Sequence, residues 1–293
     1  MAIVRPKIAV FVKYEFWVNY LLAMKRAGTK LYLISSIFRD GQIFFRPYGG
    51  LFRSALRAFR HIFVQNDSSR NLLKSIGIEQ VSVAGDTRFD RVYEIAQQAK
   101  RLPEIERFAA DAPVFIAGST WPPDEELLVG LIERYPDVKF IVAPHEIDPA
   151  RIEKFCERIS RPALRYTQLT PQSDLAAAGV LFVDTIGILS SIYRYGRWGY
   201  IGGGFGAGIH NTLEAATFGL PLAFGPRYGK FREARDLVTL RGAASIASAE
   251  ELERWFAGLH DDPDATGRSG TICKEYVLQH KGATARIMDE ICR

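Results

Sequence analysis

The chain has 293 residues, which is enough for about two domains of ordinary size. Apolar residues make up 47% of the sequence and charged residues 24%, as is typical of a globular protein with a sizeable core. No run approaches the ~20 apolar residues of a membrane-spanning helix, and no secretory signal follows Met1. The composition therefore argues against an integral membrane protein and against a secreted one.

The cysteines and the charge add two expectations. Cys156, Cys273 and Cys292 lie far apart without metal-site spacing, so we expect reduced thiols in a cytoplasmic protein. The net charge of +5 is mild but uneven. The residues of the most basic region are Arg39, Arg46, Arg53, Arg57, Arg60 and His61. Nucleic acid, an anionic membrane or a phosphorylated substrate could each use such a region, and charge alone does not choose among them.

Short β-branched runs alternate with helical patterns in the first part of the chain. They predict strands at 7–12, 30–36, 61–66 and 80–90, and helices at 20–28 and 67–77. The second helix has Asp67 as its expected N-cap and ends at Gly77. This rhythm predicts a mainly parallel sheet. Because only about four strands are found and no opening strand–glycine-loop–helix unit is visible, we expect an incomplete N-terminal domain.

The rest of the chain predicts a complete doubly wound α/β domain. A helical pattern over 91–113 carries a proline and precedes a new series of alternating strands and helices. Strands are expected at 113–120, 139–146, 179–185, 198–204 and 220–226. Helices are expected at 122–136, 149–160, 187–196 and 210–219, near 230–240, and at 248–259 and 267–292. We place the boundary near residue 100, which gives domains of 1–100 and 101–293.

A glycine-rich stretch ends one of these strands and leads into a helical pattern. Gly202, Gly204 and Ala207 satisfy the G-x-G-x-x-G/A spacing of dinucleotide binding, but that fingerprint belongs in the first β-α turn of its domain. No acid lies ~20 residues further on to hold a ribose, so NAD is not expected. Bare amides at a helix start still suit a phosphate, and Glu214, one turn inside the helix, suits the hydroxyls of a ribose. The alternative is a plain packing loop.

Three other strand ends carry candidate residues. Ser119 and Thr120 either cap the helix that follows or hold a phosphate or carboxylate with their hydroxyl and amide groups. His145 lies just beyond a strand, where ligands bind in open α/β sheets, or is an ordinary loop residue. Asp184 and Thr185 end another strand, and helix capping is their simple interpretation.

The sequence gives no sign of a metal or a cofactor. The acidic run 261–264 contains a D-x-D, the metal–nucleotide signature of some glycosyltransferases, but it follows no apolar strand. We interpret it as a turn and an N-cap. H-x-x-x-H, C-x-x-C, Walker and G-x-S-x-G motifs are absent from the sequence.

Residues 44–63 predict a basic amphipathic helix. Its apolar face would carry Phe52, Ala55, Leu56, Phe59 and Phe63. Arg53, Arg57 and Arg60 would share another face. Such a helix suits an anionic membrane surface, and a core-packing helix with a solvated basic face is the alternative.

These pieces together resemble the 3-deoxy-D-manno-octulosonic acid (Kdo) transferase family. The matching segments run in order from about residue 8 to 240: YEFW-N, Q-D…LL-SIG…V-GDTRFD, AGST…EE, DTIG-L…Y and GGGFG-GIHN-LEAA-FGLP…FGP. The combination is far more specific than any one motif. The resemblance implies a GT-B glycosyltransferase with two Rossmann-like domains. It also implies transfer of Kdo from CMP-Kdo to a lipid A precursor, with inversion and without a metal or cofactor.

The resemblance implies roles for single residues. The expected donor-binding set is Ser119, Thr120, His145, Thr185, Ile186, Gly187, Gly204, Phe205, Gly206, His210, Asn211 and Glu214. Glu214 would meet the ribose, and the other loops would meet cytidine, phosphate or Kdo. Arg53, Arg57 and Arg60 would face the acceptor and the membrane. We expect a protein peripheral on the cytoplasmic face of the inner membrane, with no nucleic-acid partner.

Three departures from the family pattern stand out. Ile188 replaces an acid that many members carry, and Ala143-Pro144-His145 lacks the arginine of P-R-H. The N-terminal GE motif with the catalytic glutamate, and the membrane-anchoring segment before it, are not found. Glu15, expected near the cleft between the domains, is the best acid left. We therefore expect a chain that binds CMP or CMP-Kdo but transfers sugar poorly. Another GT-B enzyme using a UDP-sugar, or a non-catalytic module that binds a nucleotide or a membrane surface, remains an alternative.

Overall fold

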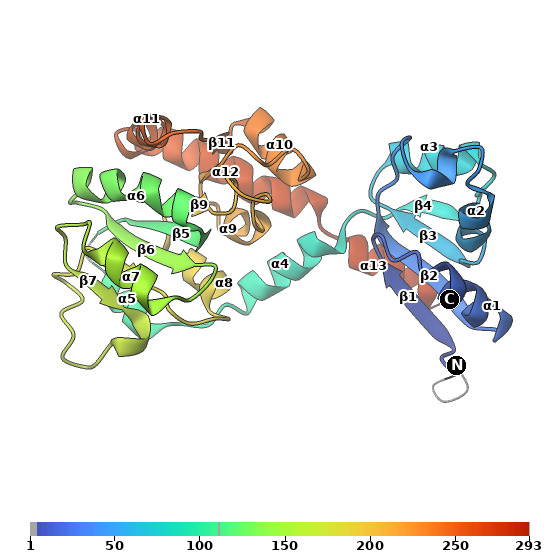
Figure 1. The fold of residues 1–293 in the computed structure, drawn as a ribbon, viewed down its shortest axis with the longest axis horizontal. Helices are drawn as coiled ribbons and strands as arrows, with labels where there is room; N and C mark the ends of the chain where they lie inside the picture. The colour runs from blue at the N-terminus through green and yellow to red at the C-terminus, as the bar shows by residue number, and fades with distance from the viewer. Residues whose placement is uncertain (1–4, 111, 293) are drawn as a thin grey trace. The chain divides into compact units, whose positions relative to one another are not determined.

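The computed structural model describes residues 5–110 and 112–292, which form two units (Figure 1). Unit 1 runs to Arg91 and also contains the segment from His280 onward, and unit 2 is Val92–Gln279. Each unit has its own parallel sheet with helices packed on it, so the predicted α/β class with two Rossmann-like domains is confirmed. The expected division into 1–100 and 101–293 differs from this one, because the last helix returns to unit 1.

Unit 1 is built on a four-stranded sheet in the order β1-β2-β3-β4. Its strands are β1 (Ile8–Val12), β2 (Lys30–Ser36), β3 (His61–Val64) and β4 (Val81–Val83). Its helices are α1 (Val18–Arg26), η1 (Ile43–Phe45), α2 (Gly50–Leu56), α3 (Asp67–Ser75) and α13 (Ala283–Ile291). All neighbouring strands pair in parallel, as predicted. The expected N-cap of α3 is wrong by one residue, since the side chain of Asn66 accepts the N–H of Ser69.

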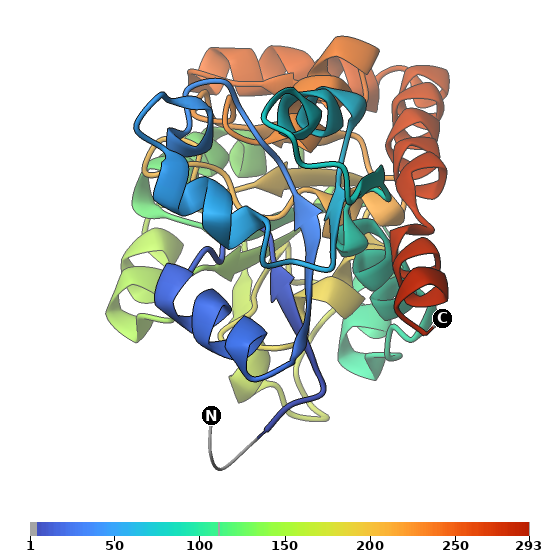
Figure 2. The same cartoon turned by 90° about the vertical axis from the view of Figure 1, so that its right-hand side faces the viewer.

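Helix α13 covers one face of this sheet, as Figures 1 and 2 show. Ile287 of α13 packs with Tyr32 and Phe63, which point to that face. The predicted single helix over 267–292 is wrong. It breaks at Gly282, whose φ of 98° is left-handed, into α12 (Pro263–His280) and α13. Asp90 holds the start of α13 by accepting the N–H and the hydroxyl of Thr284 at 2.8 and 2.9 Å.

The predicted amphipathic helix over 44–63 is also wrong. Helix α2 ends at Leu56 and β3 begins at His61, so the two ends of the segment belong to different elements. The guanidinium of Arg53 donates to the carbonyl oxygens of Phe44, Arg46 and Pro47 at 2.8–3.2 Å. Arg53 therefore holds the preceding loop, whereas Arg60 is exposed.

Unit 2 is built on a seven-stranded parallel sheet in the order β11-β10-β9-β5-β6-β8-β7. Its strands are β5 (Val114–Thr120), β6 (Lys139–Pro144), β7 (Ala163–Arg165), β8 (Val180–Phe182), β9 (Trp198–Ile201), β10 (Leu222–Phe224) and β11 (Ala243–Ser245). The five predicted strands are confirmed, and the two three-residue edge strands, β7 and β11, were missed. The proline-containing pattern at 91–113 forms two helices, α4 (Thr87–Gln97) and α5 (Pro103–Ala109).

The remaining helices of unit 2 connect its strands. They are α6 (Pro122–Arg134), α7 (Pro149–Cys156), α8 (Leu189–Ile192), α9 (Leu213–Thr217), α10 (Arg232–Leu240), α11 (Ala249–His260) and α12, with the short η2 (Tyr166–Gln168) and η3 (Tyr193–Tyr195). Buried side chains of α6, α7 and α11 form one core with the strands. Within the described residues, every helix is too short or too polar to cross a bilayer.

Candidate functional site

The strand order of unit 2 reverses between β5 and β9. From β5 the chain proceeds to β6 on one side, and it later returns to place β9 on the other side. In open α/β sheets, ligands bind outside the carboxyl ends of the strands at such a reversal. Two of the predicted sites lie at the carboxyl ends of these two strands: Ser119 and Thr120 end β5, and the glycine stretch follows Ile201 of β9.

The two loops touch through their backbones. Ser119 has a left-handed φ of 56° where the β5–β6 register shifts. A Cβ on Gly202 would lie 2.2 Å from the carbonyl oxygen of Ser119, so only glycine allows this approach. A non-glycine residue held in this conformation is strained, and such strain clusters at functional sites.

A buried carboxylate, missed from the sequence, joins the same loops. Asp124 lies in the first turn of α6 and is 1% exposed. Its Oδ2 accepts the N–H groups of Trp121 and Gly203, both at 2.9 Å, and its Oδ1 accepts the hydroxyl of Tyr200 at 2.8 Å. The acidic first turn of α6 was visible in the sequence, but nothing in the sequence indicated that Asp124 points toward the glycine stretch.

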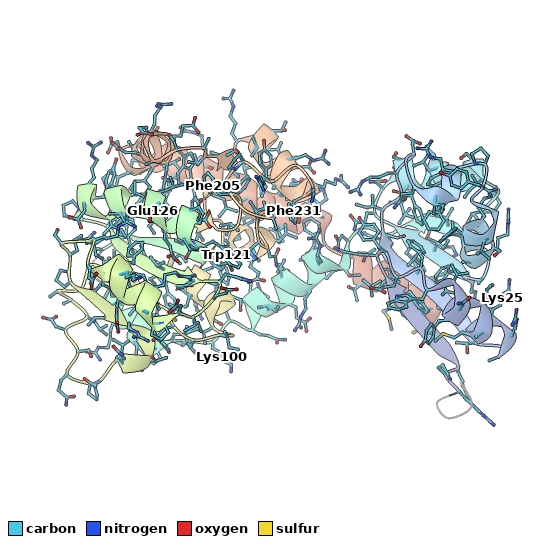
Figure 3. All side chains as sticks on the ribbon, in the orientation of Figure 1. Lys25, Lys100, Trp121, Glu126, Phe205 and Phe231 are labelled. Atoms are coloured by element: carbon cyan, nitrogen blue, oxygen red, sulfur yellow. The ribbon has the colours of Figure 1, made fainter. Side chains whose placement is uncertain are left out.

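Three aromatic rings gather at this edge. Trp121, labelled in Figure 3, stacks on His145 with ring centroids 4.9 Å apart. His145 stacks in turn on His210 at 4.2 Å. The structure therefore brings together His145 and His210, which the sequence placed in one donor-binding set, and adds Trp121.

The protonation of His210 follows from its contact with Trp121. The indole N–H of Trp121 lies 3.0 Å from Nε2 of His210. An indole nitrogen only donates, so Nε2 of His210 accepts and the imidazole proton lies on Nδ1. Burial and the neighbouring His145 lower the pKa of His210, against the opposing effect of Asp124. His210 is thus a neutral ring that offers Nδ1–H as a donor.

The glycine stretch presents amide groups, as expected, but not at a long helix. Helix α9 has only five residues, so its dipole is weaker than the predicted 210–219 helix would supply. The N–H of Gly206 is used within the loop, bonded to Gly203. Within the described chain, the N–H groups of Gly204, Phe205 and Ala207 make no hydrogen bond. Ala207 is exposed and Phe205 half-buried, whereas Gly204 is buried, so the N–H groups of Phe205 and Ala207 are the more accessible ones to an anion.

Glu214 lies at the surface of the site, half-buried in the first turn of α9. The side-chain amide of Asn211 donates to Oε1 of Glu214 at 2.9 Å and its oxygen accepts the N–H of Leu213 at 3.2 Å. Asn211 therefore orients the carboxylate and leaves its second oxygen for other donors.

The expectation for Thr120 is wrong in one respect. Its side chain is 0% exposed, and its hydroxyl donates to Oε1 of Glu125 at 2.9 Å. Burial raises the pKa of Glu125, although Thr120 and Arg151 oppose the shift. Thr120 holds the base of the turn and does not present its hydroxyl to a ligand, whereas Ser119 stays partly exposed.

The loop after β8 is largely exposed. Thr185 is half-buried, Ile186 is 83% exposed and Gly187 is exposed with a φ of 86°. Asp184 does not cap a helix. It accepts from Thr167 and Arg165, at 2.6 and 3.0 Å, and so joins β7 to β8.

The candidate residues of unit 1, Glu15 and the three arginines, differ in their exposure and contacts. Glu15 is exposed and accepts the indole N–H of Trp17. The arginines Arg53, Arg57 and Arg60 do not form one basic face, since Arg53 binds backbone carbonyls.

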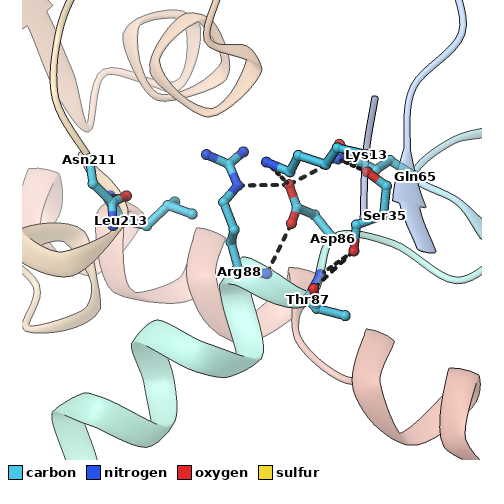
Figure 4. Close-up of polar contacts among 8 residues, drawn as sticks. All are labelled: Lys13, Ser35, Gln65, Asp86, Thr87, Arg88, Asn211 and Leu213. Carbon is cyan, nitrogen blue, oxygen red and sulfur yellow. Dashed lines mark hydrogen bonds and ion pairs between the residues drawn. The ribbon is translucent and has the colours of Figure 1, made fainter. Parts of the chain in front are cut away.

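A second polar cluster, missed from the sequence, lies at the carboxyl ends of the strands of unit 1 (Figure 4). Asp86 is 4% exposed and accepts from Nε of Arg88 at 2.9 Å and from the amide of Gln65 at 3.0 Å, and Nζ of Lys13 lies 3.6 Å away. The N–H of Thr87, the residue after Asp86, donates to the hydroxyl of Ser35 at 3.1 Å. The cluster explains the GDTRFD segment as a junction between strand ends.

The acidic run 261–264 is a helix start, as predicted. Oδ1 of Asp262 accepts the N–H groups of Asp264 and Ala265, both at 3.0 Å. In the part of the chain that the structure describes, no group of three His, Cys, Asp or Glu side chains is arranged to hold a metal ion.

Two parallel α/β units, the second with a glycine-rich loop at its strand reversal, define a fold of the GT-B type. In fold, the chain is similar to the S. aureus MnaA–UDP co-structure, with a TM-score of 0.64 at 14% identity over 98% of this chain and 75% of that one. It is also similar to the C-terminal CMP-Kdo binding domain of WaaA from Acinetobacter baumannii. There the TM-score is 0.52 at 22% identity, covering 65% of this chain and 97% of that domain.

The sequence comparisons show similarity to one family. Residues 1–91 match the family model described as 3-deoxy-D-manno-octulosonic-acid transferase (kdotransferase). The whole chain aligns with the 3-deoxy-D-manno-octulosonic acid transferase of Bordetella pertussis at 24% identity, over 98% of this chain and 69% of that protein. The predicted resemblance to the Kdo transferases is confirmed.

Proposed function

We propose that this chain binds CMP-Kdo in unit 2 and serves the transfer of Kdo to a lipid A precursor. The observation that carries the proposal is the loop pair at the β5–β9 reversal. There, unpartnered N–H groups of the glycine stretch lie in the same short segment as Glu214, whose carboxylate Asn211 orients. Backbone N–H groups suit a phosphate, and a carboxylate suits the two hydroxyls of a ribose. The similarity to a CMP-Kdo binding domain supports the choice of nucleotide.

The departing group of an inverting transfer is CMP, whose phosphate gains negative charge as the glycosidic bond breaks. Preorganised donors that meet this charge lower the barrier. Gly204, Phe205 and Ala207 supply amide donors, and His210 supplies Nδ1–H on a neutral ring. The guanidinium of Arg227 binds the carbonyl of Gly206 at 2.8 Å and so places a cation beside the loop. The proposal assigns no metal and no cofactor to these steps, as the resemblance implies.

The acceptor side of the proposal rests on the resemblance. A base must take the proton of the acceptor hydroxyl. The carboxylate of Glu15 is the proposed base, because Glu15 is exposed and lies in the YEFW-N segment that resembles the family. Lipid A precursor would be met at the cytoplasmic face of the inner membrane, where exposed arginines such as Arg57 and Arg60 suit anionic lipid.

Calorimetric titration with CMP tests the donor site. We expect wild type to bind CMP, and Glu214→Ala to bind it about tenfold or more weakly because charge-assisted hydrogen bonds to the ribose are lost. Glu126→Ala, which removes an exposed acid of the same unit, is the matched control. Identical heats for wild type and Glu214→Ala would rule out the ribose contact.

A UDP-sugar is the second candidate donor, favoured by the fold similarity to a UDP complex. A thermal-shift competition between CMP and UDP separates the two. We expect CMP to raise the melting temperature more, and a larger shift with UDP would replace the proposed donor. A non-catalytic role would follow if neither nucleotide bound while anionic liposomes did.

A further inference from the structure

Asp124 occupies an unusual place for a carboxylate beside a site for an anion. It is 1% exposed, so it does not meet a ligand from solvent directly. Both of its oxygens are committed, to the N–H groups of Trp121 and Gly203 and to the hydroxyl of Tyr200. Its charge is compatible with burial because it accepts three hydrogen bonds in the first turn of α6, where the helix dipole favours an anion.

The partners of Asp124 come from three places in the sequence. Trp121 precedes α6 as its N-cap residue and carries the ring that binds His210, Tyr200 lies in β9, and Gly203 lies in the glycine stretch. Burial and the neighbouring Asp124 raise the pKa of Tyr200, so its hydroxyl stays a donor at any ordinary pH. One carboxylate thus links the two loops that form the candidate site.

Gly203 is the point at which the glycine stretch turns. Its φ is 91°, and a Cβ there would lie 2.6 Å from the carbonyl oxygen of Gly208 and 2.9 Å from the ring of His210. The direction of the next N–H groups, those of Gly204 and Phe205, depends on how this turn is held. The bond from Gly203 N–H to Asp124 holds it from outside the loop, and so does the bond from Arg227 N–H to the carbonyl oxygen of Gly204 at 2.9 Å.

We propose that Asp124 is a positioning residue for the donor site, which fixes Gly203 so that the following amides meet the phosphate of the nucleotide. The inference rests on the proposed function for the identity of the ligand, but the anchoring itself exists without ligand. Asparagine can replace the carboxylate: its oxygen accepts both N–H groups, and its amide faces a tyrosine hydroxyl that can turn to accept. Alanine cannot.

Two measurements on the full chain test the proposal. The first is hydrogen exchange of residues 202–211 without ligand, and the second is calorimetric titration with CMP. For Asp124→Ala we expect exchange of this segment and the Kd for CMP each to rise by about tenfold or more, because the acceptor that anchors the N–H of Gly203 is lost. Asp124→Asn and the exposed control Glu126→Ala should stay within about threefold of wild type. Tyr200→Phe removes one of the three hydrogen bonds to Asp124, so its exchange rate and its Kd for CMP should lie between those of wild type and Asp124→Ala. This variant still tests the proposal if Asp124→Ala does not fold.

The outcomes separate the inference from the proposed function. A merely structural role would speed exchange in β6 as much as in the glycine stretch, and that result would overturn the inference. So would unchanged exchange and affinity in Asp124→Ala, or an Asp124→Asn variant as impaired as Asp124→Ala. If wild type fails to bind CMP while Asp124→Ala loosens only residues 202–211, the proposed ligand is wrong and the anchoring role stands.

Discussion

Trp121 and His210 lie 89 residues apart in the sequence, yet the indole N–H of one donates to Nε2 of the other at 3.0 Å. The contact determines which nitrogen of His210 carries its proton. A protonated His210 would have N–H on both nitrogens and would lose this bond.

Acid should therefore weaken unit 2 through His210. Its folded pKa is lowered from the unfolded value, by burial and by His145. The unfolded state then binds the extra proton more readily, so stability is full above the unfolded pKa of about 6.5 and is lost as the pH falls toward the folded value. We expect the wild type to lose more thermal stability between pH 7.5 and pH 5 than His210→Gln. Equal losses in the two proteins would contradict a lowered pKa of His210 in the folded protein.

The backbone approach of Gly202 to Ser119 predicts a sharp contrast within one loop. Gly202→Ala should destabilise the protein by about 1–3 kcal/mol, because its Cβ would lie 2.2 Å from a backbone oxygen that cannot move aside. Gly206→Ala is the control. Its Cβ would lie 3.6 Å from the carbonyl oxygen of Gly203, so the free energy of unfolding should change by less than about 1 kcal/mol. Urea unfolding measures both, and a tolerant Gly202→Ala would refute the contact.

Asp86 should stabilise unit 1 through its buried contacts. Asp86→Ala leaves Arg88 and Gln65 without their shared acceptor, so we expect a loss of about 3 kcal/mol or more. Asp67→Ala, which removes an exposed partner of Arg70, should cost less than about 1 kcal/mol. Chemical denaturation distinguishes them, and similar midpoints for the two variants would argue against a structural junction at Asp86.

Two arginines of the basic region should separate in their effects. Arg53→Ala should lower stability by about 1–3 kcal/mol, since it removes bonds to three carbonyl oxygens, and should leave binding to anionic liposomes unchanged. Arg60→Ala should leave stability unchanged and weaken binding to anionic liposomes, because Arg60 is exposed. Liposome flotation together with thermal unfolding makes the comparison. If Arg53→Ala bound liposomes more weakly while its stability stayed unchanged, Arg53 would belong to a membrane-binding basic surface and its assigned role in holding the loop would be wrong.

The succession of the longer strands along the chain, and the loops at which the candidate residues cluster, were determined by the sequence alone. Runs such as 30–36 and 113–120 show their strands because apolar, β-branched residues bury both faces of a parallel sheet. The Kdo transferase resemblance also depended only on the order of local motifs. The edge strands β7 and β11 were missed because their residues, ALR and AAS, include no β-branched or aromatic side chain, unlike the equally short VLF of β8.

Tertiary structure decided where the polar side chains point. The arginines of 44–63 fit a helical period, but carbonyls that only the folded loop assembles draw Arg53 away from any basic face. Thr120 ends β5 and Asp124 lies in the helix that follows, and only the packing of β9 beside β5 brought Gly203 within reach of Asp124. Hydrogen bonds between residues far apart in sequence leave no periodicity behind, because each depends on a distance that the chain acquires only when its sheet has formed.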